Sequence, residues 1–180
     1  MTNITFRTAQ FDDLPAIVGL LADDPLGRLR ETVSDPVDPR YVAAFRAIEA
    51  DANQRLVVAV ERATADDTQG RMQGDMQGDM QDAVQGERIV GTFQLSFLPG
   101  IARHGAWRGQ IEAVRIAASH RSGGIGQQMF EWAIAECRAW GCQLVQLTTD
   151  KGRPDAHRFY EKLGFVASHE GYKLALDSNR

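Results

Sequence analysis

The feature that most constrains the fold is a glycine-rich stretch between an apolar run and a helical pattern. The apolar run covers residues 111–118, and apolar positions recur at helical spacing through residues 125–140. This order predicts a strand, a loop and a helix. Arg121, Ser122, Gly123 and Gly124 lead into this helix, whose first two residues are Ile125 and Gly126. Glycine amides without a neighbouring Cβ can approach a phosphate, and a helix N-terminus adds unpaired donors. The stretch therefore predicts an anion-binding loop or, alternatively, a tight strand-to-helix turn.

Composition narrows the class of protein. The 180 residues carry a net charge of −4 and are 43% hydrophobic, which suits one globular domain and argues against a nucleic-acid partner. We expect no membrane partner, because no apolar stretch is long enough to span a bilayer and the polar start lacks a secretory signal. Cys137 and Cys142 lie in apolar patterns and are interpreted as buried free thiols, which favours a cytoplasmic location. The four histidines show no metal-ligand spacing, so no metal is expected.

Short apolar and helical patterns alternate along the whole chain. Helices are predicted from Asp12 through Leu21, over residues 41–50 and 125–140, and from Pro154 to a stop at Gly164. Strands are predicted at residues 4–7, 56–60, 88–97, 109–118, 144–148 and 171–176. This order predicts an α+β (mixed α/β) fold, with a twisted, mostly antiparallel sheet of about six to seven strands flanked by about four helices.

A tandem repeat interrupts this pattern between the second and third predicted strands. Residues 69–72, 73–76 and 77–80 each read Gln-Gly, then Arg or Asp, then Met. The glycines disfavour a stable helix, although the methionine spacing would also allow docking on a partner. We interpret the chain as a single domain over residues 1–180 with a repetitive loop insertion at about 64–86.

Two segments resemble a known family. Residues 112–126 are similar to the acyl-CoA signature of the GNAT N-acyltransferase superfamily, in which Arg or Gln is followed by two residues of any kind and then by Gly-x-Gly or Gly-x-Ala. Residues 156–165 resemble its second signature, a helix that ends in Tyr-Glu-Lys-x-Gly-Phe. The resemblance implies transfer of an acetyl group from acetyl-CoA to a primary amine, of a small molecule or a protein, by direct attack in a ternary complex. A homodimer is plausible for such a protein.

The resemblance also implies roles for individual residues. The coenzyme A pyrophosphate would lie on the amides of residues 121–126, and the pantetheine arm beside Val114, Arg115 and Ile116. The Ile116 N–H would polarise the thioester carbonyl, and Tyr160 would protonate the departing thiolate. Arg153 stands where many family members have Asn; it could reach a coenzyme phosphate or face solvent.

The reaction itself calls for a base. An amine with a pKa near ~10.4 is neutral in only about one molecule per thousand at pH 7. Glu112 is the candidate, since it precedes Val114 by two residues and a regular strand would place both on one face. An exposed strand carboxylate without a catalytic role is the alternative interpretation.

Two other functions are compatible with the glycine loop. A non-catalytic acyl-CoA sensor or interaction module would keep the fold, although the presence of both Glu112 and Tyr160 favours an enzyme. A nucleotide-phosphate binder is disfavoured, because neither Lys-Ser nor Lys-Thr follows the glycines.

Overall fold

The structure is a computed structural model that describes residues 3–24, 27–62 and 87–176. The chain divides into two compact units, which meet in sequence between Val145 and Gln146. Each unit is described by itself. The predicted insertion at about 64–86 lies outside the described residues.

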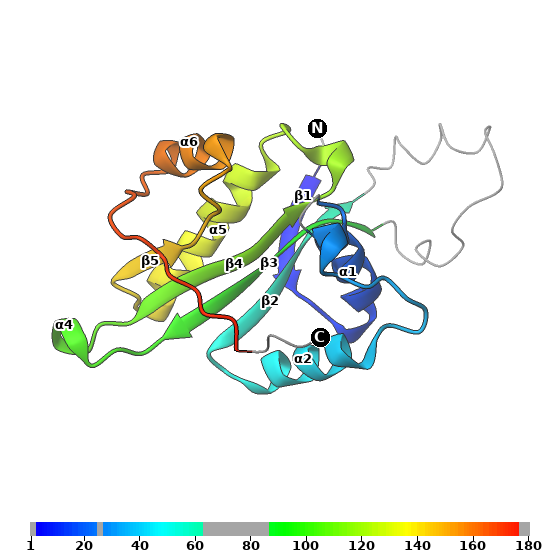
Figure 1. The fold of residues 1–180 in the computed structure, drawn as a ribbon, viewed down its shortest axis with the longest axis horizontal. Coiled ribbons are helices and arrows are strands. Elements are labelled where there is room, and N and C mark those ends of the chain that lie inside the picture. Colours follow the sequence, from blue (N-terminus) through cyan, green and yellow to red (C-terminus); the bar gives the residue numbers. More distant parts are fainter. Residues whose placement is uncertain (1–2, 25–26, 63–86, 177–180) are drawn as a thin grey trace. The chain divides into compact units, whose positions relative to one another are not determined.

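One five-stranded sheet organises the first unit (Figure 1). Its strands follow one another in chain order, and the first four pair antiparallel with their neighbours. The strands are β1 (Asn3–Thr8), β2 (Gln54–Arg62), β3 (Glu87–Leu98), β4 (Arg108–Ile116) and β5 (Leu144–Leu147), of which Leu144 and Val145 belong to the first unit. The prediction of a mostly antiparallel sheet in an α+β fold is confirmed.

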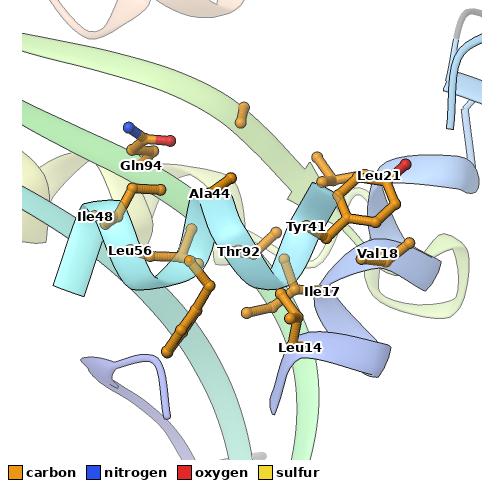
Figure 2. Close-up of a pocket in the computed structure, with 12 residues that line it drawn as sticks. Leu14, Ile17, Val18, Leu21, Tyr41, Ala44, Ile48, Leu56, Thr92 and Gln94 are labelled. Atoms are coloured by element: carbon orange, nitrogen blue, oxygen red, sulfur yellow. The ribbon is translucent and has the colours of Figure 1, made fainter. Parts of the chain in front are cut away.

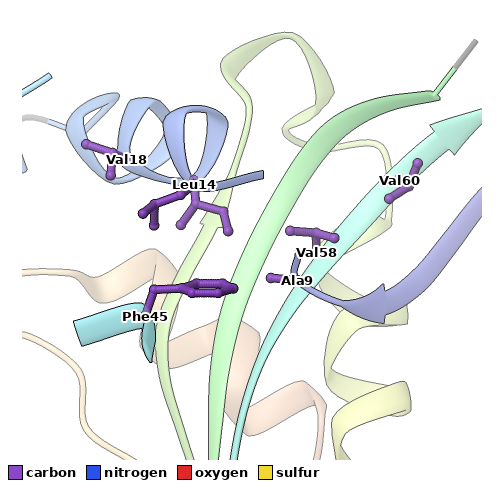
Figure 3. Close-up of a cluster of buried hydrophobic side chains, with 7 residues drawn as sticks. Ala9, Leu14, Val18, Phe45, Val58 and Val60 are labelled. Atoms are coloured by element: carbon purple, nitrogen blue, oxygen red, sulfur yellow. The ribbon is translucent and has the colours of Figure 1, made fainter. Parts of the chain in front are cut away.

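Two helices cover one face of this sheet. They are α1 (Leu14–Ala22) and α2 (Pro39–Ala50), and Asp38 caps α2 by accepting a hydrogen bond from Arg40 N. Leu14, Ile17 and Val18 of α1 meet Phe45 of α2 over Val58 of β2 (Figure 3). These side chains form the core on this side of the sheet. The burial of each aliphatic or aromatic side chain contributes about 1.5–3 kcal/mol to the stability of the fold.

The opposite face of the sheet is covered by α5 (Ile125–Trp140), whose bounds match the prediction. Trp132 contacts the rings of Phe6 and Phe93, with centroids 6.0 and 5.8 Å apart. Trp140 stacks on Phe97 at 4.2 Å. Gly141 ends the helix in the predicted left-handed conformation, with φ of 92°. A short helix, α4 (Ala102–Gly105), lies between β3 and β4 in sequence.

A β-bulge interrupts β4. Thr92 of β3 pairs with Arg115, but Gln94 pairs with Glu112, so Ala113 and Val114 together stand opposite Phe93. Ala113 has φ of 53°, in the left-handed region that residues other than glycine rarely adopt. The bulge shifts the alternation of the strand by one residue between Glu112 and Arg115.

The described residues of the second unit, 146–176, contain one helix, α6 (Pro154–Lys162). Gly164 follows it with φ of 89°, and Phe165 N donates to Tyr160 O at 3.0 Å, so the predicted glycine stop is confirmed. The predicted strand at residues 171–176 is wrong for the described chain, where these residues are irregular and Tyr172, Leu174 and Leu176 are exposed. An alternating pattern creates a strand only where a partner strand supplies hydrogen bonds. The sheet therefore has five described strands rather than six or seven.

No helix in the described part of the chain combines the length and the apolar composition needed to cross a bilayer.

Candidate active site

The glycine loop forms an open N-terminus on α5. Gly124, the residue before the helix, has φ of 81°, and Ser122 has φ of 67°. As a glycine, Gly124 has no side chain with which to cap the helix. The first N–H groups of an α-helix have no partner inside the helix, so those of Ile125 and Gly126 remain available to an anion. Residues 121–124 are exposed, which leaves the loop accessible from solvent.

Arg121 is held at this loop by three hydrogen bonds to backbone and side-chain oxygens. Its Nε donates to Ile116 O at 3.1 Å, and its Nη2 donates to Asp23 O at 2.7 Å and to Asp23 Oδ2 at 3.0 Å. These bonds tie the guanidinium to the end of β4 and to the segment after α1. Arg121 also belongs to the loop that leads into α5, so a cation and the positive end of a helix dipole lie within a few residues of each other in the sequence.

Arg115 makes a second arginine–aspartate pair with the segment that follows α1. Its Nη2 lies 3.1 Å from Asp24 Oδ2, both side chains are largely buried, and its Nη1 donates to Val114 O at 2.8 Å. Asp23 and Asp24 were not among the residues selected from the sequence. Nothing in the sequence shows that acids after the first helix would meet arginines almost a hundred residues later.

Ile116 presents its backbone N–H on the side of β4 that faces away from β3. Ala117 N donates to Val90 O at 2.9 Å, and the adjacent pair joins Ile116 with Gly91. Hydrogen-bonded and non-hydrogen-bonded pairs alternate along an antiparallel ladder, so Ile116 makes no ladder bond to β3. This geometry suits the donor role that the sequence assigned to Ile116.

Glu112 is exposed on β4, directly opposite Gln94 of β3. It forms no ion pair with any residue that the structure describes. The expectation that Glu112 and Val114 share one face of a regular strand does not hold, because the bulge interrupts the alternation between them. Glu112 instead lies on the face of Gln94 and Thr92, which is the face covered by α1 and α2.

A cavity of about 140 Å³ opens on this face between α1, α2 and the sheet (Figure 2). Its walls are mostly aliphatic, and its lining is Leu14, Ile17, Val18, Leu21, Tyr41, Ala44, Phe45, Ile48, Leu56, Thr92, Gln94 and Ala113. Ala113 is the left-handed residue of the bulge, next to Glu112. The candidate base and the cavity are therefore neighbours on one sheet face.

The polar groups in the cavity wall already have protein partners. Thr92 Oγ1 donates to Val57 O at 3.0 Å, Tyr41 Oη donates to Glu31 Oε2 at 2.8 Å, and Gln94 Nε2 donates to Gln54 Oε1 at 3.0 Å. Burial raises the pKa of the Tyr41 phenol above its ordinary value, so this wall stays uncharged at neutral pH.

Tyr160 and Arg153 belong to the second unit. Tyr160 is half-buried on α6, and its ring centroid lies 5.5 Å from that of Phe159 and 6.2 Å from that of Phe165. Arg153 is exposed and directly precedes α6, where its N–H donates to Asp150 O at 3.2 Å. The aromatic contacts fix the plane of the tyrosine ring within its own unit.

Neither cysteine is poised for nucleophilic chemistry. Burial raises the pKa of the Cys137 thiol to about 12, and a thiol with so high a pKa is inert at neutral pH. Cys142 is half-buried, so the expectation that both thiols are buried holds for Cys137 alone. In the part of the chain that the structure describes, no group of three or more His, Cys, Asp or Glu side chains could hold a metal ion.

Comparisons with known proteins identify the family to which the chain is similar. The model of the acetyltransferase (GNAT) family matches residues 39–165. A crystal structure described as a transcriptional regulator from Bacillus halodurans C-125 is 42% identical, with a TM-score of 0.79 over 97% of this chain and 100% of that one. Glucosamine-6-phosphate N-acetyltransferase from Arabidopsis thaliana shares the fold at 20% identity, with a TM-score of 0.69 over 97% of this chain and 99% of that one.

A curated relative is the aminoalkylphosphonate N-acetyltransferase of Salmonella typhimurium, strain LT2, which is 38% identical over 73 residues. This alignment covers 41% of the present chain and 47% of the relative. The chain thus matches about half the length of that protein.

Proposed function

The chain belongs to the acetyltransferase (GNAT) family, and on that premise we propose that it transfers the acetyl group of acetyl-CoA to a primary amine. The observation that carries the proposal is the exposed loop at the N-terminus of α5, in which Gly124 offers the first helical amides no capping side chain and Arg121 supplies a positive charge. Anionic phosphate groups are the ligands that such an arrangement prefers.

In this proposal the acyl donor, acetyl-CoA, is bound mainly by the protein backbone. The pyrophosphate of acetyl-CoA accepts hydrogen bonds from the amides of Ser122, Gly123, Gly124, Ile125 and Gly126, with Arg121 supplying charge. The pantetheine arm follows the main chain of Val114, Arg115 and Ile116. Arg153 is a further candidate for a coenzyme phosphate.

The acyl transfer proceeds by direct attack in a ternary complex. Glu112, directly or through water, accepts a proton from the ammonium group, and the neutral amine attacks the thioester carbonyl carbon. The Ile116 N–H stabilises the oxyanion, a contribution that can reach about 3 kcal/mol. The attacking nitrogen then releases its second proton to solvent, the C–S bond breaks, and the Tyr160 phenol donates a proton to the sulfur, so that the products are the amide and the thiol of coenzyme A. Glu112 is suited to its part because it is exposed and faces the cavity side of the sheet.

Thiol release from acetyl-CoA with a panel of amines tests the proposal, with calorimetry as a separate measure of coenzyme binding. We expect Glu112→Gln and Tyr160→Phe each to reduce kcat by about 10²–10⁴-fold, the usual size of general acid–base catalysis, while the Kd for coenzyme A stays near the wild-type value. Glu112→Gln should lose most rate at acidic pH, where the amine is most protonated. Wild-type turnover in either variant would remove that residue from the mechanism.

The other function to be distinguished is a non-catalytic acyl-CoA sensor. The crystal structure at 42% identity is described as a transcriptional regulator, and this description is the observation that favours the sensor. Heat of binding with acetyl-CoA but no thiol release with any amine would favour the sensor. No heat with coenzyme A would contradict both functions.

A further inference from the structure

Resting on the proposed function, we propose that the amine acceptor carries an uncharged apolar group, aliphatic or aromatic, which occupies the cavity between α1, α2 and the sheet (Figure 2). The inference concerns the class of acceptor. It separates this chain from the curated relative, whose name describes an aminoalkylphosphonate substrate.

The size and the walls of the cavity fit such a group. The cavity measures about 140 Å³, and its wall includes Leu14, Ile17 and Leu21 of α1 and Phe45 and Ile48 of α2. An apolar cavity of about 150 Å³ in a protein core can take up a guest the size of benzene. A branched alkyl chain or one aromatic ring is therefore of the right volume, and its transfer from water is favourable.

The charges around the cavity argue against an anionic acceptor. No Lys or Arg is among the described residues that line it. The Thr92 and Tyr41 hydroxyls and one N–H of the Gln94 amide are already bonded to other protein groups. A phosphonate placed here would lose its hydration without gaining a cation, and an unpaired buried charge is strongly unfavourable.

The position of Glu112 orients the acceptor in the cavity. Glu112 stands directly opposite Gln94, and residues opposite each other in an antiparallel pair have Cβ atoms about 4.5–5.5 Å apart. Gln94 and Ala113 both line the cavity. The ammonium group of an acceptor thus meets the Glu112 carboxylate at the β4 side, and its apolar group extends toward α1 and α2.

A homologous series of amines tests the inference on the full chain. The substrates are n-alkylamines from ethylamine to hexylamine, phenethylamine, and 2-aminoethylphosphonate at equal concentration with saturating acetyl-CoA. We expect kcat/KM to rise about fourfold for each methylene until the cavity is full, then to level off. We expect 2-aminoethylphosphonate to be at least tenfold poorer than butylamine.

Two variants of α2 test the place of binding. Ala44 lines the cavity yet is exposed, so Ala44→Leu narrows the mouth without disturbing the core; Ala47→Leu is the matched control, since Ala47 is exposed on the same helix and does not line the cavity. Ala44→Leu should lower kcat/KM for hexylamine and phenethylamine about tenfold while ethylamine and the KM for acetyl-CoA change little. Ala47→Leu should match the wild type for every amine.

The outcomes separate this inference from the proposed function. A flat alkylamine series, efficient turnover of 2-aminoethylphosphonate, or equal effects of Ala44→Leu and Ala47→Leu would overturn the apolar acceptor while leaving acetyl transfer intact. Thiol release with none of the amines, despite calorimetric binding of coenzyme A, would overturn the proposed function and this inference with it.

Discussion

Among single residues, Arg121 has one anionic partner in the structure and a second one in the proposed complex. Its guanidinium binds the Asp23 carboxylate at 3.0 Å, and it lies beside the loop proposed to bind a pyrophosphate. Both side chains are partly exposed, at 50% and 38%, so the existing pair is screened by solvent. Acetyl-CoA and Asp23 therefore compete for one cation.

Removing this competitor should strengthen coenzyme binding. We expect Asp23→Asn to lower the Kd for coenzyme A by about threefold, because an exposed ion pair contributes up to ~1 kcal/mol. Isothermal titration at low and high salt measures the change, which should shrink at high salt. Glu49→Gln is the control, since it removes one carboxylate from a surface pair with Arg46. A higher Kd for coenzyme A in Asp23→Asn would mean that the aspartate instead holds Arg121 in its binding position.

Gly109 on β4 shows how closely the sheet approaches α5. A Cβ at this position would collide with Cys137 Sγ, and Cys137 is fully buried. We expect Gly109→Ala to lower the free energy of unfolding by about 1–3 kcal/mol, the usual cost of an overfilled core. Urea denaturation measures it.

Substitution of Cys137 tests whether the loss of stability comes from the steric clash with its sulfur. Cys137→Ala removes the sulfur that the new methyl group would meet, so the Gly109→Ala, Cys137→Ala double variant should be more stable than Gly109→Ala alone. Coupling between contacting residues of this kind is about 0.5–3 kcal/mol. If the two substitutions lower the free energy of unfolding by strictly additive amounts, Gly109 is required for its backbone conformation and not because Cys137 leaves no room for a Cβ.

At the level of elements, the sequence predicted what depends on local pattern and missed what depends on pairing. The bounds of α5 and its glycine ends follow from helical periodicity and from left-handed φ at Gly124 and Gly141. The bulge in β4 could not be predicted, because Ala113 carries no sign of a positive φ. Residues 171–176 alternate like a strand but remain unpaired among the described residues.

The same limit applied to the candidate site. The motif residues 121–126 lie where the sequence placed them, at the start of α5. The side of the sheet to which Glu112 belongs depended on the bulge, and the pairs with Asp23 and Asp24 depended on tertiary structure. The cavity had no signal in the sequence either, since its wall combines residues from two helices and three strands.

The backbone of the bulge makes a prediction about stability. A left-handed alanine costs roughly 1–2 kcal/mol, and a β-branched residue costs more. We expect Ala113→Val to destabilise the protein by about 1–2 kcal/mol, while Ala113→Gly stays within about 1 kcal/mol of the wild type, because relief of strain offsets the greater freedom of the unfolded chain. Thermal unfolding of the pair measures both. Equal stability of the two variants would contradict a left-handed Ala113.

Across the whole first unit, the antiparallel order of the sheet gives its two faces different tasks. One face carries α5, whose packing against Phe93 and Phe97 holds the glycine loop at the end of a rigid helix. The other face carries α1, α2 and the cavity beside Glu112. The glycine loop, proposed to bind acetyl-CoA, and the cavity, proposed to bind the acceptor, are thus both connected to strand β4, and the bulge lies between them along the chain.

The point where β2 ends and β3 begins supports a prediction about the segment between these two strands. Arg62 and Glu87 are direct partners in the antiparallel ladder, and Arg62 Nη2 lies 2.9 Å from Glu87 Oε1. The two strand ends are already at the spacing that a two-residue hairpin closes. Residues 63–86 can therefore be replaced by Asn-Gly, the pair preferred in such turns.

We expect this shortened chain to fold and to retain wild-type kcat and Kd for coenzyme A, because the cavity lining and the glycine loop lie outside residues 63–86. Loop closure costs about 0.6 kcal/mol for each doubling of length, so the short turn should stabilise the protein by on the order of 2 kcal/mol. Thermal unfolding and thiol release measure the two quantities. A chain of equal length in which residues 63–86 are replaced by a Gly-Ser linker is the control, and loss of turnover in both variants would show that the natural segment contributes to the site.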